Sequence, residues 1–236
     1  MSDTPETTID WQRGPVPDRY RGLWRRRLLI DADGSRDADT IVWWLQTRQL
    51  FADIRLPGDR ASLAGATCYA DLGAEGLSCL TRQEGFAGVL EWTNTACAWR
   101  RQIDFRPLPG PPDEGWMDEA EDGLMIERGI HRGYLEEWVQ SIPKDAAMDE
   151  WLWHDGWGGA TVLRLGNVFM LAEDRRPAPP RPETFEDDVL AAIGNETALS
   201  ALLDCEISYG RVEADGSWRI ALSTIPWREG QTVAPL

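Results

Sequence analysis

Histidine and cysteine are scarce in this sequence, which has two histidines and four cysteines among 236 residues. No two cysteines form a CxxC pair, and neither His131 nor His154 stands beside a cysteine. Structural zinc sites combine four such ligands at short, characteristic spacings. We therefore predict no metal site. Residues 1–18 are polar and contain proline, unlike a secretory signal, so we expect free thiols in a reducing cytoplasm.

Long apolar runs and positive charge are also lacking. No stretch approaches the ~18 consecutive apolar residues of a membrane-spanning helix. The 24 Lys and Arg residues stand against 40 Asp and Glu residues, which gives a formal net charge of −16. A chain this acidic repels phosphate groups. We therefore expect neither nucleic acid nor a membrane surface as a partner.

Several catalytic motifs are missing. The sequence contains no GxSxG and no HExxH, and its glycine-rich stretch at 156–159 lacks the Lys-Ser/Thr of a phosphate-binding loop. These absences disfavour serine hydrolases, zinc proteases and nucleotide-dependent enzymes. No cofactor is predicted.

Tryptophan is abundant, with 13 residues against five phenylalanines. One interpretation is a β protein in which large side chains fill the core. The other is an aromatic pocket or contact surface, because an indole offers a flat apolar face and one N–H donor. The two interpretations are compatible.

An internal repeat organises the chain. Short matches recur in the same order at an offset of about 120 residues. They are Ala52-Asp53-x-Arg55-x-Pro57 with Ala172-Glu173-x-Arg175-x-Pro177, Glu84-x-x-x-Gly88 with Glu206-x-x-x-Gly210, and Trp99 and Pro107 with Trp218 and Pro226. We predict two copies of one domain, at 15–110 and 130–236, joined by an acidic connecting segment at 111–129.

Both copies show mainly β patterns. Alternating or β-branched runs bounded by turn residues predict strands at 24–30, 40–47, 50–56, 86–92, 97–105, 206–213 and 218–225. Apolar spacing predicts helices at 61–81 and 185–203, the second broken at Gly194-Asn195. The predicted fold is all-β with short helices, as two tandem lipocalin-like antiparallel β-barrels. A barrel of about eight strands can enclose a small ligand.

Four segments of the first copy resemble a known family. They are Val42-Trp-Trp-Leu-Gln-Thr, Leu50-Phe-Ala-Asp-Ile-Arg-Leu-Pro57, Gln83-Glu-Gly-Phe-Ala-Gly88 and Trp99-Arg-Arg-Gln-Ile-Asp-Phe-Arg-Pro107. They look like bacterial relatives of the fungal casein-kinase-interacting proteins that contain two tandem lipocalin-like barrels. The resemblance implies the tandem-barrel fold. It implies no particular reaction and no catalytic residues.

Asp53, Arg55 and Glu84 are candidates for chemistry, because a carboxylate beside a guanidinium stays ionised and can orient a substrate. Their recurrence in the second copy favours a structural ion pair instead. Within 50–56 the apolar residues alternate with Asp53 and Arg55. This alternation predicts that both charged side chains point away from the core, which weakens the catalytic interpretation.

Features found in one copy only are the better functional candidates. Trp43, Trp44, Gln46 and Arg101 are replaced in the second copy by Leu163, Arg164, Gly166 and Ile220. Arg101 shares a strand face with Trp99 and Phe105, so it either pairs with a buried carboxylate or meets an anionic ligand. In a pocket, Trp43, Trp99 and Phe105 would be the walls and Arg101 the polar anchor.

Three functional hypotheses follow. The leading one is binding of a small apolar or aromatic molecule, with or without a carboxylate group, in the first barrel. Its ligand-binding residues would be Trp43, Trp44, Gln46, Arg55, Trp99 and Phe105. The second is a cofactor-independent lyase, isomerase or hydratase with Glu84, Asp53 and Arg101 as catalytic residues. The third is a protein-interaction module that uses a Trp-rich surface toward a partner or a second copy.

Overall fold

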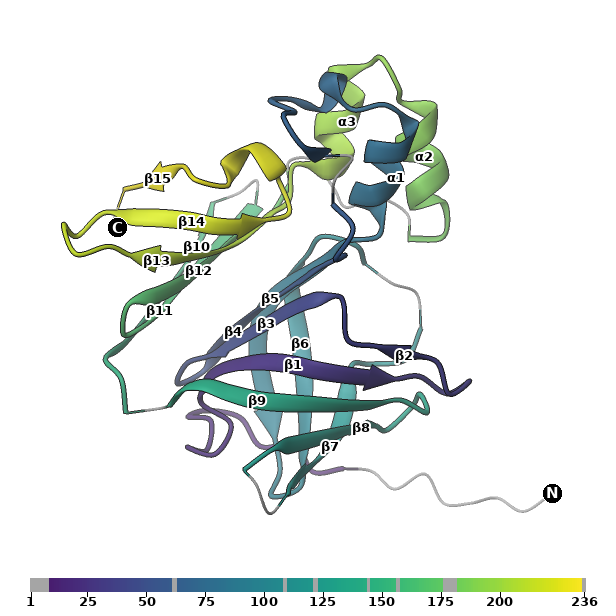
Figure 1. Ribbon diagram of the computed structural model, residues 1–236. Helices are drawn as coiled ribbons and strands as arrows, with labels where there is room; N and C mark the ends of the chain where they lie inside the picture. Colours follow the sequence, from purple (N-terminus) through teal and green to yellow (C-terminus); the bar gives the residue numbers. More distant parts are fainter. Residues whose placement is uncertain are drawn as a thin grey trace.

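The computed structural model describes residues 9–60, 63–107, 110–120, 123–143, 145–155, 158–175 and 182–234. Two antiparallel sheets lie side by side, with short helices grouped at one end (Figure 1). The first sheet contains β1 (Gly22–Ile30), β2 (Arg36–Asp37), β3 (Ile41–Gln46), β4 (Leu50–Leu56), β5 (Glu84–Trp92), β6 (Ala96–Asp104), β7 (Glu114–Glu119), β8 (Met125–Gly129) and β9 (Leu135–Pro143).

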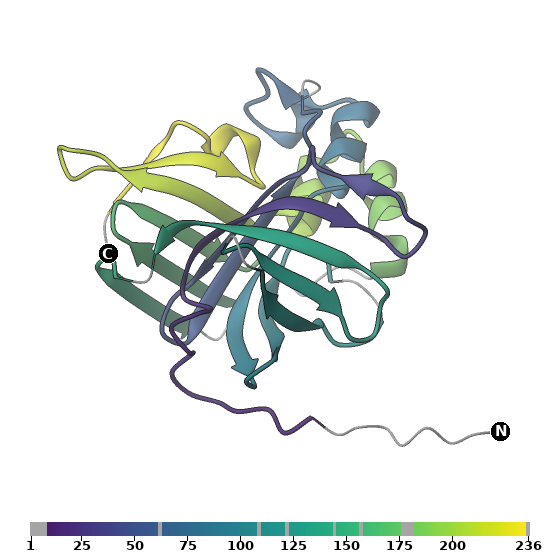
Figure 2. The ribbon, with the colours of Figure 1, turned by 60° about the horizontal axis from the view of Figure 1, so that its bottom comes forward.

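The first sheet closes on itself. Its order is β2-β1-β3-β4-β5-β6-β7-β8-β9, and β9 pairs again with β1 from Gly22 opposite Pro143 to Ile30 opposite Leu135. Figure 2 shows β1 and β9 adjacent where the barrel closes. Eight strands therefore form a closed antiparallel barrel, with β2 as a short addition to β1. The predicted all-β class with short helices and a barrel in the first part of the chain is confirmed.

The second sheet is open. It has the order β10-β11-β12-β13-β14-β15, and no pairing of described residues joins its two edges. Its strands are β10 (Met148–Asp155), β11 (Gly158–Leu165), β12 (Val168–Glu173), β13 (Glu206–Val212), β14 (Trp218–Ser223) and β15 (Thr232–Val233). The second barrel of the predicted tandem is thus not confirmed.

The acidic segment 111–129 holds strands rather than a plain connection. β7 and β8 both lie within it and extend the barrel wall, and β9 follows at once. In β7, Met117 points into the barrel while Asp118 and Glu119 are exposed. Glu114 and Glu127 are buried, so acidic residues occupy both faces of these strands and the sequence lacks a regular alternation of apolar and polar residues, which explains the difference. The chain leaves the first sheet after Pro143 and enters the second at Met148.

The order of elements repeats along the chain. The first part of the chain contains, in order, β1, β3, β4, α1 (Ala74–Thr81), β5, β6 and β7. The second part contains the similar order β10, β11, β12, two helices, β13, β14 and β15. A bulge interrupts the pairing at Gly88 in the first sheet and at Gly210 in the second. A Cβ would lie 2.0 Å from the Arg100 carbonyl oxygen at Gly88 and 2.4 Å from that of Arg219 at Gly210. This close approach explains why the Glu-x-x-x-Gly pattern recurs.

The helix predicted at 185–203 is broken where the sequence indicates. α2 (Phe185–Ala191) and α3 (Glu196–Leu203) flank Gly194, which has a φ of 82°. The Asn195 side chain accepts a hydrogen bond from the Ala198 backbone N–H and caps α3. Helix α1 lies within the predicted 61–81 and packs against α2, so both parts of the chain contribute to one helical group.

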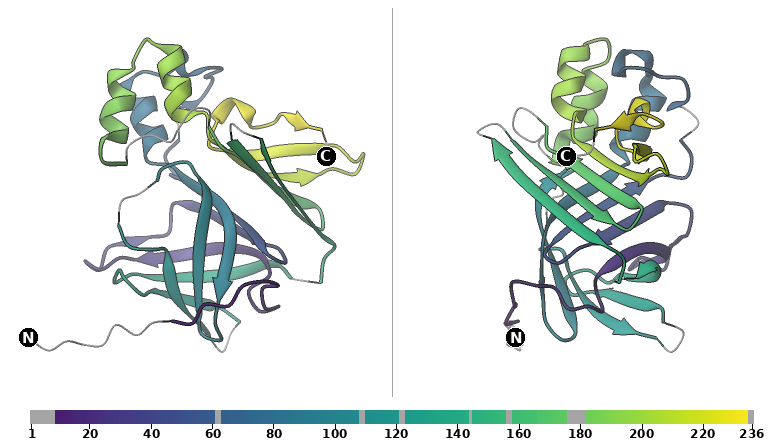
Figure 3. Two further views of the ribbon diagram at one scale, coloured as in Figure 1. Left: turned by 180° about the vertical axis from the view of Figure 1, so that it is seen from behind. Right: turned by 90° about the vertical axis from the view of Figure 1, so that its left-hand side faces the viewer.

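The second sheet packs against the outside of the barrel over β3–β6 (Figure 3). Ala52, Ile54 and Leu56 of β4 belong to the apolar core shared with β11–β13. A separate aromatic core fills the barrel interior, including Trp24, Trp44, Phe51, Phe86, Trp99 and Trp138. Strand β4 is therefore buried on both faces, one against the second sheet and the other inside the barrel.

Candidate functional site

A hollow of about 590 Å³ lies at the end of the barrel where β1, β4, β6 and β8 finish. Its wall is formed by Leu29, Asp31, Arg55, Glu84, Trp99, Arg100, Arg101, Asp104, Pro107, Pro111, Pro112, Asp113, Glu114, His131, Arg132, Tyr134 and Glu136. Ionised groups dominate it, and Trp99, Leu29 and the prolines supply an apolar strip. Below it, Trp44, Trp138, Phe51 and Phe86 are almost fully buried, so side chains occupy the deeper barrel. The sequence predicts an apolar pocket, whereas most of the residues that line the observed hollow are charged.

Asp53 and Arg55 face the barrel interior, and the prediction that they point away from the core is wrong. The apolar residues of β4 face the second sheet, which covers the barrel from outside. The opposite face of β4 consequently points into the barrel. Asp53 is 2% exposed and lies directly opposite Trp44. An alternating pattern identifies two faces but cannot say which face lies inside when both are buried.

Arg55 is held by two carboxylates at the base of the hollow. Its Nε donates to Asp53 Oδ1 at 2.9 Å, and its Nη1 donates to Glu136 Oε1 at 3.2 Å. Glu136 also accepts from Arg26 Nη1 at 2.8 Å, and Arg26 Nη2 donates to Asp37 Oδ2 at 2.6 Å. The network ties β4 to β1, β2 and β9 across the barrel.

Arg101 lies on the same wall and has its own carboxylate partners. Its guanidinium carbon is 3.5 Å from the centre of the Phe86 ring, a cation–π contact. Nη1 donates to Asp104 at 3.1 Å, and Nη2 donates to Asp113 at 2.6 Å. Of the two roles weighed for Arg101, the structure places it with carboxylates.

Glu84 presents its carboxylate to the hollow. It stands directly opposite Arg55 in the β4–β5 pairing, so both side chains project to the same side. Yet the Arg55 guanidinium turns toward Asp53 and Glu136. Among the described residues, none donates a hydrogen bond to the half-buried Glu84 carboxylate or forms an ion pair with it. Arg55 stays charged nevertheless, because Asp53, Glu136 and Glu84 outweigh the effect of burial and raise its pKa.

Burial shifts the carboxyl pKa values in this network. It raises the pKa of Asp53 to about 6, against the opposing effect of Arg55. It also raises the pKa of Asp104, which Arg101 only partly offsets. Asp53 therefore titrates close to neutral pH, although both of its oxygens face Arg55.

Glu127 lies deeper in the barrel and is 3% exposed. Its carboxyl accepts hydrogen bonds from the Tyr134 hydroxyl at 2.6 Å and from Trp138 Nε1 at 3.1 Å. Burial, with the neighbouring charge of Glu136 directly opposite in the β8–β9 pairing, holds the pKa of Glu127 well above its usual range. In the folded protein, Glu127 is consequently protonated and neutral at any pH below this raised pKa.

We predict that Glu127→Gln stabilises the protein at alkaline pH. The unfolded chain releases this proton near the usual value of 4.5, whereas the folded protein retains it. The native state then binds more protons, so this group lowers the free energy of unfolding as pH rises from 4.5 to the raised pKa. The glutamine amide does not titrate and therefore does not lower the stability as pH rises. The Tyr134 hydroxyl can rotate to accept a hydrogen bond from the amide NH2 group. Urea unfolding should give equal stabilities near pH 4 and a gain of roughly 1–3 kcal/mol for the variant at pH 8.

Glu91→Gln is the matched control. Glu91 is ion-paired with Arg13 and Arg100, and these partners outweigh burial and lower its pKa. Its contribution has the opposite sign, being present above the usual pKa and lost as pH falls. Glu91→Gln should therefore destabilise the protein at pH 8. Equal stabilities of wild type and Glu127→Gln across the whole pH range would contradict a neutral Glu127.

Four predicted ligand-binding residues lie away from the hollow. Trp43 is on the outer barrel face and stacks on Tyr209 of β13, with ring centres 5.2 Å apart and planes 4° apart. Phe105 also lies outside, with its ring 5.9 Å from that of Phe185. Trp44 is in the filled core against Trp24, Trp99 and Trp138. The Gln46 amide donates to the Leu50 carbonyl oxygen at the opposite end of β4.

The remaining predicted residues do come together. Arg55, Glu84, Arg101 and Trp99 line the hollow, and Asp53 lies behind Arg55. Sequence reasoning missed the residues contributed by the segment after Pro107: Asp113, Glu114, Glu127, His131, Tyr134 and Glu136. His131 Nε2 lies 2.8 Å from Glu114 Oε2. The available signal was the spacing of two residues between Met125 and Glu127 and between Glu136 and Trp138, which places each acidic residue on the same strand face as a large apolar one.

The recurrent charged residues do not form the same unit in both sheets. Asp53 is opposite Phe86 and Arg55 is opposite Glu84, whereas Glu173 is opposite Glu206. Glu206 pairs with Arg228, and Arg175 donates to the Asp104 and Phe105 carbonyl oxygens of the barrel. The sequence repeat therefore places similar residues at a register that differs by two positions. Their recurrence is no reason to regard the barrel network as purely structural.

Comparisons with known proteins add a fold relationship. No family model matches the chain, and no curated protein matches it significantly. The structure is similar to the crystal structure of an uncharacterized protein from Saccharomyces cerevisiae, with a TM-score of 0.52 and 11% sequence identity. The similarity covers 85% of this chain and 84% of the yeast chain, and it concerns the fold alone. Within the described residues, no helix has the length and apolarity required to cross a membrane.

Proposed function

We propose that the barrel binds a small organic molecule in the hollow at its open end. The observation that supports this most is the composition of the wall, which places an apolar strip that includes Trp99 beside ionised groups around about 590 Å³ of space. Ligand sites usually have this combination of apolar surface and a few oriented polar groups, at such volumes. Trp99 would contact the flat part of the ligand, and Glu84, Arg55 and Arg101 would contact its polar part.

The proposed binding site is more polar than the sequence alone suggests. The deep barrel is filled by tryptophan and phenylalanine side chains, which leaves the apolar molecule of the leading hypothesis little room there. Space is found at the polar end. We therefore retain small-molecule binding as the proposed function and move the site to the barrel end.

A cofactor-independent lyase, isomerase or hydratase is the second candidate. The pKa of Asp53, raised to about 6, suits a group that exchanges protons near neutral pH. Asp53 is, however, bonded to Arg55 and covered by it, so Glu84 is the better placed base on the wall. An enzyme would lose turnover in Glu84→Gln while Trp99 and the arginines still bind substrate.

We also infer that the chain arose by duplication of a β unit and that the second copy is an incomplete barrel. The shared order of elements and the equivalent bulges at Gly88 and Gly210 support this. A lipocalin-like ancestry and a cytoplasmic location remain proposals. The four cysteines are free, and Cys79, Cys97 and Cys205 are buried, as expected of thiols in a reducing compartment.

Native mass spectrometry of protein purified from its own host tests the proposed function. We expect an additional mass that denaturation releases. Leu29→Trp, which enlarges a side chain on the wall of the hollow, should reduce occupancy at least ~10-fold by steric exclusion. Leu152→Trp is the matched control, because Leu152 lies 41% exposed on β10. A released molecule retained equally by both variants would exclude the hollow as its site.

A bare chain would instead favour the interaction module. Trp116 and Val139 are each 41% exposed on β7 and β9 of the barrel wall and would be the first residues to substitute.

A further inference from the structure

The open end of the barrel has more carboxylates than guanidinium groups. Arg26, Arg55 and Arg101 face the carboxylates of Asp37, Asp53, Glu84, Asp104, Asp113 and Glu136. Each of these guanidiniums already binds two carboxylates. Arg100 is similarly bound between Glu91 and Glu114. Arg132 at the rim is also engaged. The charge left without a partner at this end is therefore negative.

Two carboxylates on the wall of the hollow, Glu84 and Asp31, have no guanidinium partner among the described residues, and of these Asp31 is exposed whereas Glu84 is half-buried. Asp53, Asp104, Asp113 and Glu136 each lie within 3.2 Å of a guanidinium nitrogen. Glu84 lines the hollow without such a partner among the described residues. A carboxylate that is partly desolvated and unpaired attracts a cation more strongly than one exposed to water.

We propose that the ligand of this hollow is an organic cation, an amine or guanidinium attached to a planar group, and that Glu84 binds its charge. This inference rests on the proposed small-molecule function. The cation would complete the ion pair that Glu84 lacks, and the planar group would lie on the Trp99 side of the hollow. An anionic ligand would have to displace the carboxylates from Arg55 or Arg101, and would add negative charge where it is already in excess.

The size and lining of the hollow favour an organic cation over a metal ion. A volume of about 590 Å³ exceeds what one ion and its ligands need, and much of the wall is formed by rings: Trp99, Tyr134 and three prolines. Within the part of the chain that the structure describes, no three His, Cys, Asp or Glu side chains converge in metal-binding geometry. The binding experiment below therefore also includes Mg²⁺ as a competitor.

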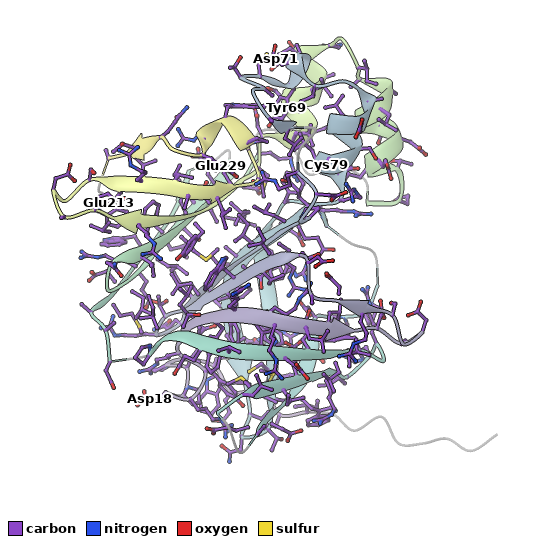
Figure 4. The ribbon with its side chains drawn as sticks, viewed as in Figure 1. Asp18, Tyr69, Asp71, Cys79, Glu213 and Glu229 are labelled. Carbon is purple, nitrogen blue, oxygen red and sulfur yellow. The ribbon has the colours of Figure 1, made fainter. Side chains whose placement is uncertain are left out.

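Three indoles of matched shape test the charge preference. Isothermal titration would compare tryptamine, 3-propylindole and indole-3-propionate, which are cationic, neutral and anionic near pH 7.5. We expect tryptamine to bind at least ~10-fold more tightly than either analogue. Glu84→Gln should remove this preference, and Glu84→Asp should retain it. Glu213→Gln is the control, because Glu213 lies on the β13–β14 turn, away from the barrel end (Figure 4).

The outcomes separate this inference from the proposed function. Tighter binding of indole-3-propionate, or an unchanged tryptamine affinity in Glu84→Gln, would overturn the cation inference and leave small-molecule binding intact. Displacement of tryptamine by MgCl₂ beyond the effect of NaCl at equal ionic strength would replace the organic cation with a metal ion. No binding of any indole, together with a bare chain from the host, would overturn the proposed function itself. Circular dichroism of each variant confirms that its fold is retained.

Discussion

A chain that ends at residue 145 will not form a soluble, monomeric barrel, although all eight barrel strands lie within it. The reason is the outer face of β3–β6. Leu45, Ala52, Ile54, Leu56, Ala87, Ile103 and Phe105 are all buried in the core that includes the second sheet and the helices. Burying one large apolar side chain contributes about 1.5–3 kcal/mol. Exposing this group therefore removes an amount comparable to the entire stability of a typical domain, roughly 5–15 kcal/mol.

Size-exclusion chromatography and urea unfolding of the shortened chain provide the measurement. We expect aggregates or a non-cooperative transition. Supplying residues 146–236 as a separate chain is the control, since it restores the covering sheet and should recover soluble material. A monomeric barrel with a cooperative transition would contradict this prediction and would support the independent first domain that the sequence repeat suggests.

Trp44→Ala will remove about 3–5 kcal/mol from the free energy of unfolding. Trp44 is 1% exposed at the centre of the barrel, where its ring lies 5.6 Å from Trp99 and 5.7 Å from Trp138. Substitution by alanine leaves a cavity that these rigid neighbouring rings cannot fill. Urea unfolding followed by far-UV circular dichroism measures the loss.

Trp44→Phe is the informative partner of this variant. The Trp44 Nε1 hydrogen is buried without a hydrogen-bond acceptor among the described residues. Phenylalanine retains most of the ring and removes this unsatisfied donor, so two effects oppose each other. We expect a loss below about 1.5 kcal/mol. Equal losses for the alanine and phenylalanine variants would mean that the indole N–H, rather than packing, stabilises the barrel.

The strands could be predicted from the sequence wherever one local pattern determined them. β1, β3, β4, β5, β6, β13 and β14 all overlap predicted strands, and the break between α2 and α3 falls at Gly194-Asn195. The segment 111–129 was misinterpreted because its acidic residues lie on both faces of the strands: Asp118 is exposed, whereas Glu114 and Glu127 are buried. Local patterns also could not reveal that β9 pairs with β1 and closes the first sheet without help from the second copy.

The candidate site was predicted in part and for incomplete reasons. Arg101 was predicted as a site residue because it is a charged residue on an apolar strand face, and it does line the hollow. Trp43 and Phe105 were predicted as aromatic walls of the pocket, but they point toward the second sheet and the helices. The partners that determine the chemistry, Glu136 and Asp113, come from a part of the chain that showed no catalytic motif.

The sequence by itself determined the β class, the repeated order of elements, the bulge glycines and the charged residues of β4 and β5. These properties depend on the backbone and on neighbours within a few residues. Only the tertiary structure decided which face of β3–β6 lies inside the barrel, because the second sheet and the helices bury the apolar outer face of these strands and both faces are then covered. That choice turns Asp53, Arg55 and Glu84 inward. Arg55 then binds Asp53 on its own strand and Glu136 across the barrel, whereas its cross-strand neighbour Glu84 has no hydrogen-bond or ion-pair partner among the described residues.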